Sequence, residues 1–415
     1  MKIPKDHKNQ IMKKLKLLSA IFLLAVIASC SKNSVKPNTP GKKDSTTTTG
    51  VTVNGGPGVY AVGHDASKVN PGNLSRFATL WKNGKAYRLS DGNFNATGNS
   101  VYADDKDVYV AGFETNSAGI KVAKLWVNGV GTNLTDGKYE AVASSVFVYN
   151  GKVYVAGYEV SDYDASGGFY KSVARLWINK VASTLNGGAL ASSVYIYKND
   201  VYVTGSTYEA NAVIWKNGVL TALNGSGAQD YPPTSIFVAQ DHVYVTGQGY
   251  PTGSLDAKWF LKLDSVGKAY LKTGNFINGS YVYGFPYHIA VVWKDGKADN
   301  PVIGDNYQAL TYASAVFVSG GDVYIAGGNQ IGVATLWKNG VNTDLTAYTS
   351  PSLAYSVYVN GSDVYVSGMG TNANGKRVAT IWKNGVATNI GSSDNDASTP
   401  GQIGGGVANS VFVVQ

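Results

Sequence analysis

A short repeated segment constrains the fold more than any other feature of the chain. The copy at residues 334–345 reads ATLWKNGVNTDL, in which two short runs flank an Asn-Gly pair. Asn-Gly favours a type I′ hairpin turn because both turn residues take positive φ. Copies with the same Trp and a related turn begin at Phe77, Val122, Val173, Ala212, Ile289 and Val378. The chain is therefore expected to consist largely of β-hairpins.

A second hairpin alternates with the first. The copy at residues 356–368 reads SVYVNGSDVYVSG, and its alternating β-branched and aromatic residues around a tight turn are typical of strands. Together the two hairpins give four strands per repeat, named A to D in chain order, with a longer connection from D to the next A. Such a unit, recurring about every 45 residues, predicts an all-β propeller with A strands lining the channel and D strands outermost.

The number of strand-C tryptophans indicates the number of blades. Seven occupy the same repeat position: Trp81, Trp126, Trp177, Trp215, Trp293, Trp337 and Trp382. Leu263, with Leu271 eight residues later, is interpreted as an eighth unit, so the sequence predicts eight four-stranded blades. Between Leu271 and Trp293 there is room for one clear strand. The alternative is therefore seven blades, with the fifth and sixth units sharing one irregular blade.

The two ends of the repeat region complement each other. Residues 58–63, GVYAVG, form a B strand without its A strand, and residues 409–414, NSVFVV, form an A strand without its B strand. We expect the C-terminal strand to pair with the N-terminal blade and close the ring. Closure removes free sheet edges that favour aggregation, and we expect a monomer.

The repeats resemble the extracellular repeats of the HAF family, whose units combine a Trp-x-Asn-Gly turn, a following Leu and an Asn-x-x-Gly-like hairpin. ATLWKNGVNTDL and SVYVNGSDVYVSG carry the resemblance, which covers most of residues 59–415. The chain departs from the family by having Val-Ala-Thr or Phe-Ala-Thr in place of the His-Ala-Phe triplet. The resemblance implies an exported repeat domain and no activity for any particular residue.

The first 50 residues differ from the repeats. Met12 begins MKKLKLLSAIFLLAVIASC, whose basic start, short apolar run and small residues before Cys30 are typical of a secretory signal. The closing Ile-Ala-Ser-Cys resembles a bacterial lipobox, which implies cleavage before Cys30 and acylation of that cysteine. We therefore expect a lipoprotein signal at residues 1–29, with Met12 as the true start. The alternative is an ordinary signal peptide with an incidental cysteine.

Charge separates the leader from the repeats. Residues 1–29 contribute +5 and residues 30–50 contribute +3 to the net charge of +8, which leaves residues 51–415 neutral. A neutral propeller lacks the basic surface that nucleic-acid binding requires, so nucleic acid is not an expected partner. Residues 30–50 are polar and rich in Pro, Thr and Lys, and we expect a flexible tether. The expected location is the bacterial cell envelope, lipid-anchored at the outer membrane or the cell surface.

Signatures of catalysis and metal binding are weak. The repeats contain neither a zinc-binding spacing of His and Cys nor a Gly-x-Ser-x-Gly nucleophile motif. Glu114, Glu159 and Glu209 follow strand B and would either converge at one mouth of the ring or form polar strand ends. Asp162, Asp164 and Ser166 resemble the first half of a calcium loop without its downstream Glu, and a solvated turn is the alternative. No other cofactor is expected.

Aromatic residues outside the repeat pattern indicate where a ligand would bind. The repeated Trp and Tyr are interpreted as packing between blades. The others lie in D–A crossings and in B–C connections, which share one face of a propeller; we call it the loop-rich face, and the candidates are those of the B–C connections. These candidate ligand-binding residues are Tyr158, Tyr163, Phe169, Tyr170, Tyr208, Tyr250 and Tyr287.

We expect contact in the B–C connections of blades two to four, centred on Phe169, Tyr170 and Tyr208. Residues 158–171 form the longest B–C connection, with four aromatic residues and two aspartates. The alternative is that this connection packs on its own blade. Three functions remain open: a binding module for glycan or peptide, a scaffold that docks to another envelope protein, and, with least support, a carbohydrate-active enzyme.

Overall fold

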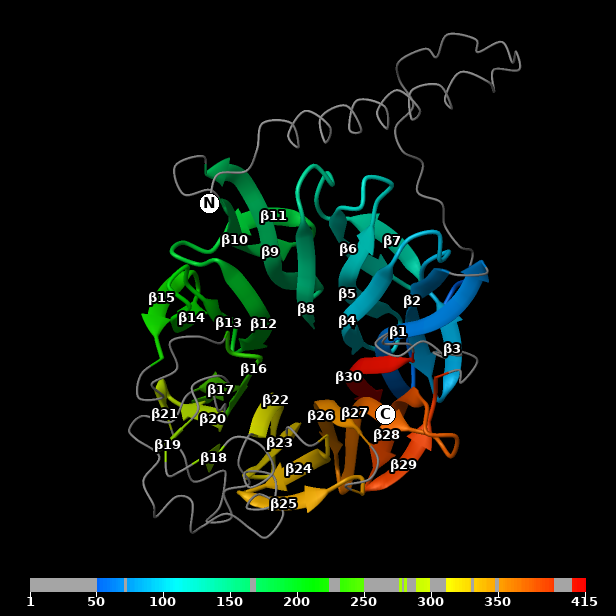
Figure 1. The fold of residues 1–415 in the computed structure, drawn as a ribbon. Helices are drawn as coiled ribbons and strands as arrows, with labels where there is room; N and C mark the ends of the chain where they lie inside the picture. The colour runs from blue at the N-terminus through cyan, green and yellow to red at the C-terminus, as the bar shows by residue number, and fades with distance from the viewer. Residues whose placement is uncertain are drawn as a thin grey trace, which may run out of the picture. The chain divides into compact units, whose positions relative to one another are not determined.

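A computed structural model describes residues 51–70, 73–164, 169–223, 232–249, 276–277, 280–281, 289–298, 311–329, 332–347, 351–391 and 405–415. Within this part of the chain, seven four-stranded antiparallel sheets are arranged as the blades of a β-propeller (Figure 1). No helix among the described residues is long and apolar enough to span a membrane.

Each blade runs from an inner strand A to an outer strand D. Blade 1 contains β30 (Val407–Val414), β1 (Gly58–Asn70), β2 (Asn73–Lys82) and β3 (Lys85–Arg88). Blade 2 contains β4 (Ala96–Ala103), β5 (Val108–Thr115), β6 (Lys121–Val127) and β7 (Val130–Asn133). Blade 3 contains β8 (Ala141–Tyr149), β9 (Lys152–Asp164), β10 (Phe169–Ile178) and β11 (Val181–Thr184).

The remaining blades follow the same order. Blade 4 contains β12 (Leu190–Tyr197), β13 (Asp200–Ser206), β14 (Ala212–Lys216) and β15 (Val219–Ala222). Blade 5 contains β16 (Ser235–Ala239), β17 (His242–Gly249), β20 (Ile289–Lys294) and β21 (Lys297–Ala298). Blade 6 contains β22 (Thr311–Ser319), β23 (Asp322–Asn329), β24 (Ala334–Lys338) and β25 (Val341–Asp344). Blade 7 contains β26 (Leu353–Asn360), β27 (Asp363–Thr371), β28 (Arg377–Lys383) and β29 (Val386–Asn389).

The strand pairing in blade 5 shows that the propeller formed by the described residues has seven blades, the alternative to the eight that the sequence predicted. Strand β17 pairs directly with β20, with Val245 opposite Trp293, so the unit around Trp293 supplies the outer half of blade 5. The chain between them includes the short pair β18 (Phe276–Ile277) and β19 (Ser280–Tyr281). Leu263, taken as an eighth strand C, lies outside the described residues. A long B–C connection therefore accounts for what spacing suggested was a separate blade.

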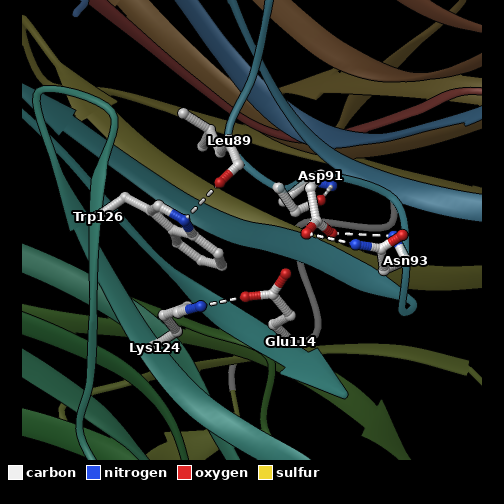
Figure 2. A network of polar contacts seen from close by, with 8 residues as sticks. Leu89, Asp91, Asn93, Glu114, Lys124 and Trp126 are labelled. Atoms are coloured by element: carbon white, nitrogen blue, oxygen red, sulfur yellow. Dashed lines mark hydrogen bonds and ion pairs between the residues drawn. The ribbon is translucent and has the colours of Figure 1, made fainter. Parts of the chain in front are cut away.

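The chain closes the ring as predicted. Strand β30 pairs with β1, with Phe412 opposite Tyr60, so the last strand completes the first blade. The repeated tryptophans are buried between blades. Trp126 in blade 2 is 1% exposed and donates from Nε1 to the carbonyl oxygen of Leu89, which follows β3 of blade 1, at 2.9 Å (Figure 2). Packing between blades, rather than ligand binding, therefore explains this tryptophan position.

The Asn-Gly turns fasten strand C to strand B. Asn339 and Gly340 have φ of 50° and 83°, as a type I′ turn requires. Asn339 Oδ1 accepts a 2.8 Å hydrogen bond from the Val323 amide, and its Nδ2 donates to Asp322 Oδ1 at 2.7 Å. Equivalent side-chain acceptors serve the amide of the corresponding valine at the start of strand B in the other blades: Asn83, Asn128, Asn179, Asn217, Asp295 and Asn384. The most prominent motif of the sequence is therefore structural.

Candidate functional site

A ring of aromatic side chains narrows the central channel. Each blade contributes one residue from strand A, and neighbouring ring centroids lie 4.6–5.3 Å apart around a closed circuit. We call this set the aromatic collar; its members are Tyr102, Phe147, Tyr195, Phe237, Phe317, Tyr358 and Phe412. Aromatic pairs at such spacing stabilise packing beyond the area they bury. The sequence analysis missed the collar, although its signal is visible as the aromatic third residue of each SVYV-like strand.

A polar ring lies three residues before the collar, toward the loop-rich face. In six of the seven A strands a β-bulge leaves one residue outside the pairing with strand B, and Thr234 holds the corresponding position just before β16. We call this set the bulge ring; its members are Asn99, Ser144, Ser192, Thr234, Ser314, Tyr355 and Asn409. All are polar and none carries a charge.

Three members of the bulge ring link neighbouring blades. Asn409 Nδ2 donates to the carbonyl oxygen of Gly98 at 2.9 Å, and Asn99 Nδ2 donates to that of Ala143 at 3.0 Å. Thr234 Oγ1 donates to the carbonyl oxygen of Ala313 at 2.9 Å. Each acceptor immediately precedes the bulged residue of the next blade. These bonds join blade 1 to blade 2, blade 2 to blade 3 and blade 5 to blade 6 beside the channel.

A pocket opens beside one half of the bulge ring. Its volume is about 400 Å³, within the usual range for small-ligand sites. Its lining comes from blades 5, 6, 7 and 1: Thr234, Gln248, Tyr312, Ser314, Tyr355 and Asn409. Four of these belong to the bulge ring, near the start of strand A, where the chain arrives from the D–A crossing. The pocket therefore lies at the mouth of the channel on the loop-rich face.

Tyr312 and Tyr355 break the regularity of the repeats here, whereas the position of Gln248 has a different residue in every blade. The bulge position is Asn, Ser or Thr in every other blade, but Tyr355 occupies it in blade 7. Tyr312 lies two residues before its bulge, where the other blades have Thr, Val, Leu or Pro. The facing residue is Gly328, where a Cβ would lie 2.7 Å from the Val333 carbonyl oxygen and 3.3 Å from the Tyr312 hydroxyl. Residues that depart from a structural repeat are the better candidates for a ligand site.

The pocket has no ionisable side chain other than its two tyrosines. Burial, followed by the neighbouring Tyr355 phenol, raises the pKa of Tyr312. Burial raises the pKa of Tyr355 as well, against an opposing effect of Arg377. Both hydroxyls therefore stay protonated at neutral pH and donate hydrogen bonds. The lining combines neutral donors and acceptors with two aromatic faces.

The predicted aromatic residues of blade 3 lie on a hairpin rather than in a loop. Strands β9 and β10 continue outward with Asp164 opposite Phe169 and Tyr163 opposite Tyr170, so most of the expected 158–171 connection is paired backbone. Tyr158 is partly buried, and its hydroxyl donates to Glu140 Oε1 at 3.2 Å. Burial, then the charge and hydrogen bond of Glu140, raises the pKa of Tyr158 to about 12.

The other predicted residues are scattered or lie outside the described part of the chain. Tyr208 is 50% exposed, and its hydroxyl donates to the carbonyl oxygen of Ser172 in blade 3. Of the proposed calcium ligands, Asp162 and Asp164 lie in β9. Ser166, Tyr250, Tyr287 and the lipidation candidate Cys30 are outside the described residues. The structure therefore leaves these predictions untested. The pocket is lined by blades 5, 6, 7 and 1, whereas the described candidates lie in blades 3 and 4.

The strand-B glutamates do not form a shared acid pair. Glu114 pairs with Lys124 inside blade 2 (Figure 2), and Glu159 pairs with Arg175 inside blade 3 at 3.0 Å. Glu209 is exposed. Among the described residues, no three His, Cys, Asp or Glu side chains are grouped so as to hold a metal ion.

Comparisons with known proteins do not assign the chain to a family. No family model matches the chain, and the search of curated proteins finds no relative. Among solved structures, the chain is similar to the crystal structure of the computationally designed Ika8 protein, with 13% identity and a TM-score of 0.39. That similarity covers 82% of this chain and 90% of the designed one. The chain is therefore described by its own geometry, as a seven-bladed β-propeller.

Proposed function

We propose that the protein is a binding module of the cell envelope that takes a neutral, hydroxyl-rich ligand, the end of a glycan, in the pocket at the channel mouth. The observation that carries this proposal is the local break in the repeat at Tyr312 and Tyr355, beside Gln248 in the same pocket lining. A regular propeller does not need a tyrosine at either position for its own packing pattern, since the other blades do without one. Each of these three side chains supplies a group that a sugar uses for recognition.

The chemistry of the lining favours a sugar over a charged ligand. Tyrosine rings offer apolar faces for the C–H surface of a pyranose, and their hydroxyls donate hydrogen bonds. The Gln248 and Asn409 amides and the Ser314 hydroxyl each combine donors with acceptors, as sugar hydroxyls do. An anionic or cationic ligand would find no opposite charge in the lining itself. A volume of about 400 Å³ suits the end of a chain rather than a long internal segment.

The test is a glycan array followed by titration calorimetry with the strongest neutral ligand. Tyr355→Ala and Gln248→Ala should each weaken binding at least tenfold, because each removes direct contacts. Ser144→Ala is the matched control: it occupies the same bulge position on the half of the ring away from the pocket, and it should bind normally. Circular dichroism would establish that each variant is folded.

A second variant separates this site from the hairpin of blade 3. If replacing Tyr163, Phe169 and Tyr170 by Ala abolishes binding while Tyr355→Ala does not, the ligand binds at the hairpin instead. If no neutral glycan binds the parent protein, the glycan proposal is wrong, and peptide binding or a scaffold function takes its place.

The proposal includes surface attachment through acylated Cys30. Cys30→Ser should move the protein from the membrane fraction to the soluble fraction. Unchanged fractionation would refute the lipid anchor and would leave the ligand proposal standing, since the two rest on different residues.

A further inference from the structure

The chain enters the propeller on the face opposite the pocket. Residues 51–56 run along the A–B and C–D turns of blade 2; we call the face formed by these turns the turn face. The Val53 amide donates to the Asn128 carbonyl oxygen at 3.2 Å. The Gly55 and Gly56 amides donate to the backbone carbonyl oxygens of Lys106 and Asp104 at 2.9 and 2.8 Å. Val53 is 3% exposed and belongs to the core cluster around Trp126. The entry point is therefore fixed.

The rim of the turn face has an unusual composition. The residue directly after each C–D turn opens the outermost strand, and it is Lys in two blades and Val in five: Lys85, Val130, Val181, Val219, Lys297, Val341 and Val386. Four of the valines are 69–73% exposed and Val130 is 49% exposed. Charged residues usually protect such exposed edges. An aliphatic side chain at this exposure forgoes its favourable burial.

In three blades, the aspartate that opens strand B is paired with a lysine at the end of strand C. Asp200 and Asp322 lie 2.8 Å from the ammonium groups of Lys216 and Lys338, and Asp363 lies 2.7 Å from that of Lys383. The rim positions themselves contain no acid in any blade. Aliphatic and cationic side chains together suit an interface with anionic lipid, where lysines meet headgroups and apolar groups enter the boundary region.

Because the expected tether before residue 51 is short, a weak contact between the turn face and lipid would be enough to hold the domain at the surface. The sequence predicts a flexible tether of about 20 residues from Cys30, whose root-mean-square span is roughly 25 Å. A tether of this kind raises the local concentration of the attached domain to the millimolar range. A face with modest affinity for lipid would then be held against the surface, although it would not bind vesicles when untethered.

We propose that the turn face lies against the lipid surface to which the N-terminal segment anchors the protein, with the Val/Lys rim in contact and the pocket directed outward. This orientation leaves the loop-rich face free for ligands at a distance from the membrane. It assigns a function to the exposed valines, which take no part in the cores between blades.

The experiment couples the protein through Cys30, its only cysteine, to maleimide-bearing vesicles of phosphatidylcholine and phosphatidylglycerol. Lysine acetylation is then measured by mass spectrometry. Lys85 and Lys297 report on the rim, and Lys121, whose side chain is 40% exposed at the start of β6, reports on the loop-rich face. Coupling should slow acetylation of the two rim lysines several-fold and leave that of Lys121 unchanged.

A variant with Val181, Val219, Val341 and Val386 changed to Ser tests the contact itself. It should remain folded and coupled but lose the rim protection. Protection that persists in this variant, or equal protection of Lys121, would overturn the proposal. Rim protection that appears without vesicles and grows with protein concentration would also overturn it, because a second copy of the chain would then cover the rim.

Discussion

Ser100 in blade 2 accepts, through its Oγ, a 3.1 Å hydrogen bond from the backbone amide of Val146 in blade 3. The same contact recurs between neighbouring blades wherever the first residue of the SVYV-like strand is serine: Ser145 to Val194, Ser193 to Ile236, Ser235 to Val316, Ser356 to Val411 and Ser410 to Val101. At the boundary of blades 6 and 7 the serine is replaced by Ala315, so the Val357 amide lacks this acceptor.

Ala315→Ser should stabilise the protein. The new hydroxyl would meet the Val357 amide as its counterparts do, and a net intramolecular hydrogen bond contributes about 1 kcal/mol. The midpoint of guanidinium unfolding should rise without a change in slope. Ser100→Ala is the reverse control and should lower the midpoint by a similar amount. A lower midpoint for Ala315→Ser would mean that the 8% exposed site cannot accommodate the oxygen.

Trp337→Ala should destabilise the propeller strongly. Trp337 is 6% exposed and packs with Val316, Ile325 and other buried residues of blades 5 and 6. Removing a buried Trp costs roughly 3–5 kcal/mol through lost transfer energy and the cavity left behind. The matched control is Val341→Ala, four residues away and 70% exposed, which should change the melting temperature little. Equal melting temperatures for both variants would show that this indole does not support the core.

Sequence reasoning recovered what every repeat shares and missed what depends on closing the ring. The hairpins, the buried Trp and the pairing of β30 with β1 follow from local patterns and from complementary ends. The spacing of Leu263 and Leu271 suggested an eighth unit, but β17 pairs directly with β20, so the described residues form the alternative number of seven blades. The pocket was missed because bulge residues are identified only by strand register, and Gln248 and Asn409 line one pocket only when the ring closes.

His64 should make stability fall in mildly acidic solution. Burial, followed by the charge of Arg76, lowers the pKa of His64 from 6.5 to about 4. As the pH falls from about 6.5 to 4, His64 binds a proton in the unfolded chain but stays neutral in the folded protein. The free energy of unfolding therefore decreases in that pH range. Between pH 7 and pH 5 the loss is about 2 kcal/mol. His64→Gln should remove this component; an unchanged pH dependence in that variant would assign it to other groups.

Deleting residues 410–415 should open the ring. The deletion removes most of β30, including its pairing with β1, the collar member Phe412, and the Ser410 hydroxyl that accepts from Val101. Strand β1 would then present an unpaired edge, which favours association with other chains. Light scattering after size exclusion should show aggregates, and the melting temperature should fall. Removal of Gln415 alone, which loses only the 2.6 Å contact of its side chain with Asn360, is the control and should leave a monomer. A monomeric deletion variant with the parent's melting temperature would show that β30 is dispensable for closing the ring.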